Sequence, residues 1–161
     1  MKIHLLEREQ ILPIGIDEAW EFFSSPSNLD AITPPELGFK ITSRSEGAMY
    51  EGQIITYSVR VAPAVWVSWV TEIKAVEPRR AFVDEQRFGP YRFWHHRHLF
   101  EETPEGVRMS DRVHYALPFP PFGEIGHRWF VRPKLERIFD FRKQELTRRF
   151  GRAPVRMEAA S

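Results

Sequence analysis

The sequence contains no cysteine. Disulfide frameworks, thiolate zinc sites and cysteine nucleophiles are therefore excluded, although this absence does not determine the redox compartment. The sequence also lacks any run of 18 apolar residues, and Glu7, Arg8 and Glu9 interrupt the segment where a signal peptide needs an unbroken apolar stretch. We expect a soluble, cytoplasmic protein with no integral membrane association.

An excess of charge of one sign is missing as well. The chain has 23 basic and 22 acidic side chains, for a formal charge of +1. A global nucleic-acid footprint is therefore absent, and we expect no nucleic-acid partner. The chain has no nucleotide-binding glycine loop, no serine nucleophile motif and no helical zinc motif, so we expect no cofactor.

Aromatic residues, in contrast, are abundant. They make up 14% of the chain, and 13 of them are phenylalanine. This is more large, rigid apolar surface than the core of a 161-residue protein requires. Two interpretations remain open, a cavity lined with rings and a core that is merely aromatic.

The hydrophobic periodicity predicts one domain over residues 1–150 and a flexible tail over 151–161. A first strand is expected at 2–14, then a helix capped by Asp17 and broken at Pro26, and a second short helix at 27–32. A long amphipathic helix, bent or restarted at Pro133, is expected at 124–150. Between them, period-two alternation predicts strands at about 38–45, 50–62, 65–77, 80–88, 91–102 and 107–117.

This order predicts an α+β fold in which a curved antiparallel sheet of about seven strands wraps round the long last helix. The sheet must bury its apolar face, and the last helix is the only element long enough to cover it. The space between them is either a solid core or a pocket of about 300 to 1,000 Å³. Residues 118–123 join the last strand to this helix and are expected to form a lid or rim at the pocket mouth.

Several segments resemble a known group of proteins. Residues 19–23 (AWEFF) with 27–29 (SNL), and 135–142 (LERIFDFR), are similar to the helix-grip superfamily, which includes START lipid-transfer domains, polyketide cyclases and dehydratases, and plant pollen allergens. Residues 82–123 resemble a bacterial subgroup described as SRPBCC or cyclase-like. The resemblance spans residues 1 to about 150. It implies the helix-grip fold, but it does not choose an activity, because the fold hosts carriers, enzymes and receptors.

The run of residues 89–100, GPYRFWHHRHLF, contains three histidines within four positions. In the hairpin closed at 103–106, strand pairing places His98 opposite Asp111 and His96 opposite Val113, on the apolar face of the sheet. His95 and Arg97 then point outward. The remaining pairs of this register are Phe100 with Met109 and Trp94 with Tyr115.

Two further hairpins extend the same face. Across the turn at 89–91, Gln86 is expected beside Trp94 and Asp84 beside His96. Phe82 and Phe88 share that face. The hairpin around Pro78 adds Trp69, Thr71 and Ile73.

The polar cluster on this face has four interpretations. A polar network needs no ligand, because Asp111 beside His98 and Asp84 beside His96 satisfy one another. Alternatively, the cluster orients an oxygenated, ring-containing ligand, or one histidine is a general base whose tautomer the carboxylate sets. A metal held by His96, His98 and one carboxylate is the fourth interpretation; we predict no metal.

We therefore predict an internal cavity that binds a small hydrophobic or aromatic molecule, lipid- or polyketide-like, in a carrier or sensor. One alternative is a polyketide cyclase or dehydratase-like enzyme with His98, His96 and Asp111 as catalytic residues; another is a protein-interaction module with a filled core. A homodimer is among the open oligomeric states. The basic side of the last helix is interpreted as a solvated face, with phosphate contact as the alternative; its residues are Arg128, Arg132, Arg137, Arg142, Arg148 and Arg149. The predicted ligand-binding residues are Tyr57, Trp69, Phe82, Asp84, Gln86, Trp94, His96, His98, Tyr115 and Phe139.

Overall fold

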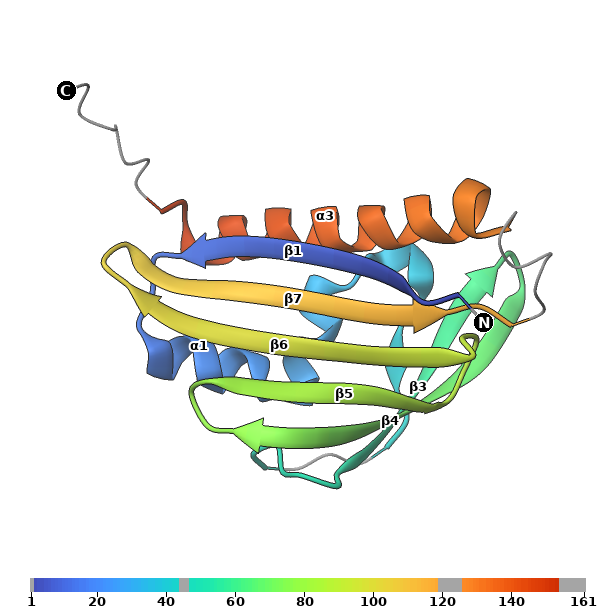
Figure 1. Ribbon diagram of the computed structural model, residues 1–161, viewed down its shortest axis with the longest axis horizontal. Helices are drawn as coiled ribbons and strands as arrows, with labels where there is room; N and C mark the ends of the chain where they lie inside the picture. The colour runs from blue at the N-terminus through green and yellow to red at the C-terminus, as the bar shows by residue number, and fades with distance from the viewer. Residues whose placement is uncertain (1, 44–46, 119–125, 154–161) are drawn as a thin grey trace.

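The computed structural model describes residues 2–43, 47–118 and 126–153. A single seven-stranded sheet in the order β1-β7-β6-β5-β4-β3-β2 curves beneath a long C-terminal helix (Figure 1). Every strand pair is antiparallel. The predicted fold class is therefore confirmed. The elements are β1 (His4–Leu12), α1 (Ile16–Phe23), the 3-10 turns η1 (Pro26–Asn28), η2 (Asp30–Ile32) and η3 (Pro35–Leu37), β2 (Lys40–Ile41), β3 (Ile54–Ala62), β4 (Val65–Glu77), β5 (Ala81–Phe88), β6 (Phe93–Thr103), β7 (Gly106–Ala116), the π-helical turn η4 (His127–Val131) and α3 (Arg132–Phe150).

The helices differ from the sequence prediction in detail. Gly15, not Asp17, is the N-cap of α1, and no side chain caps the helix; Asp17 instead forms an ion pair with Arg79. The predicted second helix is broken into the 3-10 turns η1 and η2, since Pro26 begins the first of them. Pro133 is the second residue of α3 and directly follows the π-helical turn; because proline has no N–H for the helical ladder, the change from π- to α-helical pairing lies where the sequence predicts a bend or restart.

The strand register of β5, β6 and β7 is the one expected from the sequence. His98 pairs with Asp111 and His96 with Val113, while Asp84 pairs with His96. Gly106 closes the β6–β7 hairpin with a φ of +130°, and a Cβ there would lie 2.1 Å from the Leu12 carbonyl oxygen. Backbone packing against the end of β1 therefore requires glycine at the turn that sets this register.

At the last residue of β5, the sequence prediction of which side chains face inward is wrong. A register shift between Val70 and Thr71 pairs Val70, rather than Trp69, with Phe88, and Phe88 is 72% exposed. The expectation that Phe88 shares the inner face is therefore wrong, because a bulge changes the alternation that the sequence predicts. Trp66 is also exposed and packs against Gly38.

Two apolar clusters hold α1 and α3 against the sheet. Phe22 and Phe23 of α1 pack with Phe100 and Met109. Leu135 and Phe139 of α3 pack with a second group of sheet residues; that group includes Leu6, Trp94, Val113 and Tyr115. No helix in the described part of the chain is long and apolar enough to cross a bilayer. The predicted tail and the 118–123 connection lie largely outside the described residues.

Candidate functional site

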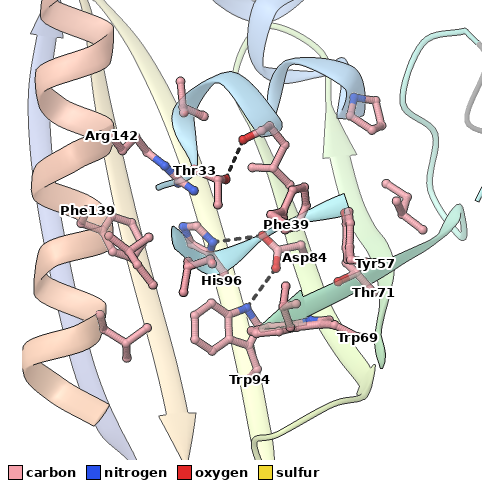
Figure 2. Close-up of a pocket in the computed structure, with 18 of the residues that line it drawn as sticks. Thr33, Phe39, Tyr57, Trp69, Thr71, Asp84, Trp94, His96, Phe139 and Arg142 are labelled. Atoms are coloured by element: carbon pink, nitrogen blue, oxygen red, sulfur yellow. Dashed lines mark hydrogen bonds and ion pairs between the residues drawn. The ribbon is translucent and has the colours of Figure 1, made fainter. Parts of the chain in front are cut away.

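A cavity of about 370 Å³ lies between the inner face of the sheet and α3. Strands β3 to β6 form one wall, α3 forms another, and α1 with the 3-10 turns closes the space from a third side (Figure 2). Its lining is predominantly apolar. Eight of the predicted ligand-binding residues line it, namely Tyr57, Trp69, Phe82, Asp84, Trp94, His96, His98 and Phe139.

Three predicted site residues are not in the cavity wall. The amide of Gln86 turns back on the 89–91 corner, where Nε2 donates to the Tyr91 carbonyl at 2.6 Å and Oε1 accepts from the Tyr91 N–H at 3.3 Å. Tyr115 is 2% exposed, and its hydroxyl lies 2.8 Å from His127 Nε2. Asp111 lies behind the two histidines.

Two imidazoles and two carboxylates form a closed ring of contacts. The hydrogen bonds join His96 Nε2 to Asp111 Oδ1 at 2.8 Å and His98 Nε2 to Asp84 Oδ2 at 3.0 Å. Each second ring nitrogen faces the other carboxylate, with His96 Nδ1 3.0 Å from Asp84 Oδ2 and His98 Nδ1 3.0 Å from Asp111 Oδ1. The contacts directly across the strands, His96 with Asp84 and His98 with Asp111, are the predicted ones; the two diagonal hydrogen bonds are additional.

The position of His96 between two carboxylates determines its charge. A neutral imidazole carries one N–H, so one of the two carboxylates would face a bare nitrogen lone pair. Burial lowers the pKa of His96, but the charges of Asp84 and Asp111 and their hydrogen bonds outweigh burial and raise the pKa to about 9. His96 is therefore an imidazolium at neutral pH.

Both carboxylates are held in the charged form. Burial raises the pKa of Asp84, but His96 and His98 more than offset burial and hold the pKa well below its usual range. The indole N–H of Trp94 adds a hydrogen bond to Asp84 Oδ1 at 3.0 Å. The same balance of burial against the two histidines keeps the pKa of Asp111 low. The buried charges are therefore paired, as a low-dielectric interior requires.

Arg142 is a site residue, although the helical pattern predicts that it lies on a solvated face. It is 8% exposed and lines the cavity. Its guanidinium carbon lies 4.9 Å from the ring centroid of Phe139, and NH1 lies 3.8 Å from Asp111 Oδ1. A signal was present, since Leu135, Phe139, Arg142 and Leu146 follow the spacing of the buried stripe of α3.

Two more cations and several apolar groups in the wall were also missed. Lys134 and Arg60 line the cavity; they donate to the backbone carbonyls of Val61 and Glu36. The sequence does not show that these side chains line one cavity, since Arg60 lies in β3 and Lys134 in α3. The other missed residues include Phe22, Phe23, Leu29, Ile32 and Ile55.

Known proteins share this architecture. No protein-family model matches the chain, and no curated protein matches it closely. Among solved structures, the Thalictrum norcoclaurine synthase, in complex with a transition-state analogue, is 13% identical, with a TM-score of 0.63 over 92% of this chain and 96% of that one. The ARO/CYC protein StfQ of the steffimycin pathway is 13% identical (TM-score 0.63), covering 92% of this chain and 52% of its two-domain chain. Ara h 8.0201 is 15% identical (TM-score 0.57), covering 91% and 99%.

The chain has the helix-grip fold. The resemblance of residues 1–150 to helix-grip proteins is therefore confirmed at the level of the fold. Identities of 13 to 15% carry no activity from these neighbours to this chain.

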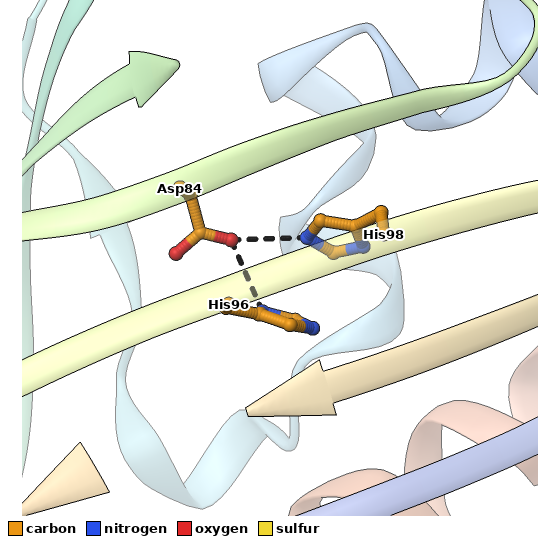
Figure 3. A group of neighbouring side chains, drawn as sticks. All are labelled: Asp84, His96 and His98. Atoms are coloured by element: carbon orange, nitrogen blue, oxygen red, sulfur yellow. Dashed lines mark hydrogen bonds and ion pairs between the residues drawn. The ribbon is translucent and has the colours of Figure 1, made fainter. Parts of the chain in front are cut away.

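The polar ring in this helix-grip cavity has the donor set for proton transfer and for metal binding. Asp84, His96 and His98 offer ligand atoms that all lie within 4.8 Å of one another (Figure 3), and two imidazoles with one carboxylate suit several divalent transition metals. A metal would, however, need His96 deprotonated, and the guanidinium of Arg142 lies close behind. A metal ion at these nitrogens would therefore compete with the proton that the two carboxylates hold on His96.

Proposed function

We propose that this protein binds a small hydrophobic or aromatic molecule in the cavity between the sheet and α3, as a carrier or sensor. The observation that carries the proposal is a cavity of about 370 Å³ whose wall is mostly apolar and aromatic. Cavities of this size and composition are the usual sites for small molecules. Trp69 and Trp94 supply ring faces, with centroids 5.1 Å apart and planes nearly perpendicular.

In this proposal the imidazole and carboxylate groups of the polar ring orient the bound ligand. His96 and His98 lie among the aromatic side chains of Trp94, Phe82 and Phe139, and they are 4% and 6% exposed. A few polar groups in an apolar pocket select an orientation for the ligand, while the apolar surface provides most of the binding free energy. A lipid- or polyketide-like molecule with both a hydrocarbon body and an oxygen substituent suits this arrangement.

Binding can be tested with 1-aminoanthracene, a fluorescent aromatic probe that is neutral at pH 7. Ile55 lines the cavity and is 1% exposed, whereas its neighbour Ile54 is 49% exposed on the opposite face of β3. We expect Ile55→Trp to fill the cavity and weaken probe binding by about 10-fold or more. Ile54→Trp is the matched control and should bind as the unchanged protein does.

Two results would count against the proposal. One is no saturable fluorescence change with the unchanged protein; the other is equal binding by both variants, which would place the probe on the surface. Circular dichroism of each variant checks that the fold is intact.

An enzyme of the cyclase or dehydratase type is the second candidate, favoured by the imidazole–carboxylate ring in the cavity wall. Because His96 is protonated at neutral pH, it can act as an acid but not as a base. His98 is then the remaining candidate base: Asp84, which accepts a hydrogen bond from Nε2, would fix its tautomer, and the buried Nδ1, 3.0 Å from Asp111 Oδ1, would have to turn toward the cavity to take a proton. In this candidate Asp111 supports the acid His96.

Proton abstraction can be measured without knowing the natural substrate. 2-Tetralone carries acidic protons beside its carbonyl group, and NMR in heavy water follows their exchange for deuterium. Exchange above the buffer rate that His98→Ala removes, with 1-aminoanthracene binding retained, supports the enzyme. Exchange at the buffer rate leaves the carrier or sensor as the better account.

The interaction-module alternative requires a filled core. The cavity of about 370 Å³ does not support that requirement.

A further inference from the structure

The charges around the cavity are unbalanced. Its wall contains the cations Arg60, Lys134 and Arg142 but, among the described residues, one carboxylate, Asp84. Asp84 already accepts hydrogen bonds from Trp94 and His98. Even with Asp111 behind the histidines included, these three cations outnumber the two carboxylates.

Burial and nearby positive charge have a visible effect at Lys134. Burial, and then the charges of Arg137 and Arg60, lower the pKa of its ammonium. A cation whose neighbours are cations gains from an incoming anion. The cavity wall near Lys134 therefore attracts negative charge.

Arg142 has hydrogen-bond donors that the described residues leave unused. Its Nε is buried and has no partner among them, and the 3.8 Å from NH1 to Asp111 Oδ1 is too long for a hydrogen bond. A buried donor without an acceptor costs about 1 to 3 kcal/mol, more when it is charged. Figure 2 shows the side chain of Arg142 reaching from α3 toward the pocket.

The apolar surface between the two helical cations fits an extended ligand. Lys134 and Arg142 are eight residues apart, about 12 Å along the helix axis, and Ile138 and Phe139 line the cavity between them. A ligand whose charged end contacts Arg142 can thus lay its hydrocarbon body along these residues.

On the basis of the proposed function, we propose that the cavity selects hydrophobic carboxylic acids and that Arg142 binds their carboxylate. The planar guanidinium matches a carboxylate with two parallel N–H···O bonds, which a compact ammonium cannot form. A singly charged group also suits the surroundings better than a phosphate, because Asp84 and Asp111 lie nearby and would repel a second negative charge.

A matched pair of ligands tests this inference on the unchanged protein. 2-Naphthoate and 2-naphthamide have nearly the same shape and differ in charge, so calorimetry at pH 7 isolates the contribution of the carboxylate. We expect the acid to bind about 10-fold more tightly than the amide, as one charge-assisted hydrogen-bonding contact provides.

Two variants assign the preference to Arg142. Arg142→Met removes the charge and keeps an apolar stem, while Lys143→Met removes one positive charge from the exposed neighbouring position. We expect Arg142→Met to lose the preference for the acid, and Lys143→Met to keep both that preference and the affinity for the amide. Should Arg142→Met fail to fold, Arg142→Lys should keep the charge but weaken the preference by several-fold, since the bidentate geometry is lost.

The outcomes separate this inference from the proposed function. Equal binding of acid and amide by the unchanged protein would overturn the inference and leave a neutral-ligand cavity. A preference that survives Arg142→Met but disappears in Lys134→Met would also overturn it. Failure of naphthoate, naphthamide and 1-aminoanthracene alike would count against the proposed function itself.

Discussion

His96 is hydrogen-bonded to Asp111, its diagonal neighbour in the sheet, with 2.8 Å between Nε2 and Oδ1. Asp84, directly opposite His96, approaches the other ring nitrogen at 3.0 Å. The imidazole therefore lies between two buried carboxylates. This arrangement couples the charge of the cavity wall to the stability of the fold.

Stability should fall as the pH rises above neutrality. The pKa of His96 is raised from about 6.5 to about 9, so folding favours its protonated form. The associated stability is complete below about pH 6.5, declines as the pH increases, and is lost above about pH 9. It amounts to roughly 3 kcal/mol. Urea unfolding between pH 6 and 9.5 measures the decline, and His96→Gln should flatten the profile.

The two aspartates act in the opposite direction. Their lowered pKa values stabilise the fold above about pH 4, and this stability is lost as the pH falls below that value. Maximum stability is therefore expected between about pH 5 and 6.5. A free energy of unfolding that stays level or rises from pH 6 to 9 would contradict the assignment of charge to His96.

Asp111→Asn should destabilise the protein by about 3 kcal/mol. The amide keeps the shape of the carboxylate but leaves Arg142 without its buried carboxylate and His96 with only one of its two, Asp84. Asp140→Asn is the control on the surface of α3; the Asp140 side chain is 62% exposed and lies 4.0 Å from Arg8, so a change below about 0.5 kcal/mol is expected. Urea unfolding at pH 6 compares the two variants, and equal effects would argue against a charged ring.

Phe139→Ala should enlarge the cavity at a cost in stability of about 3 to 5 kcal/mol, because Phe139 is 4% exposed and packs against the sheet. Phe130→Ala is its control at a position that is 74% exposed, where little change is expected. Thermal unfolding gives the order of the two variants. Similar melting temperatures for both would show that α3 does not pack on the sheet as described.

Divalent metal ions should not stabilise the protein at pH 7. Binding Zn²⁺ to His96 and His98 would displace a proton from His96 and bring a second cation close to Arg142. The measurement is the melting temperature with Zn²⁺ and, separately, with Ni²⁺. A saturable rise that His98→Ala abolishes would contradict this prediction and favour a metal site at Asp84, His96 and His98 instead.

The inner face of β6 could be predicted because its determinants are local. Alternation along β6 and β7 and the turn at 103–106 determine which histidines face inward, and the structure has the expected pairing of His98 with Asp111. The order of strands and the long last helix likewise follow from hydrophobic periodicity. The sequence by itself therefore determined the fold class and the position of the polar cluster.

Contacts between segments that are distant in the sequence determined the positions of Phe88 and Arg142. The bulge in β5 between Gln86, which pairs with Thr71, and Phe88, which pairs with Val70, turns Phe88 outward. It arises from the fit of two strands, which no local pattern records. Arg142 faces inward because an imidazolium–carboxylate ring lies opposite that turn of α3 and offers it a buried partner. The periodicity of α3 placed Arg142 on the buried stripe, but only tertiary packing supplied the charges that make burial of a guanidinium tolerable.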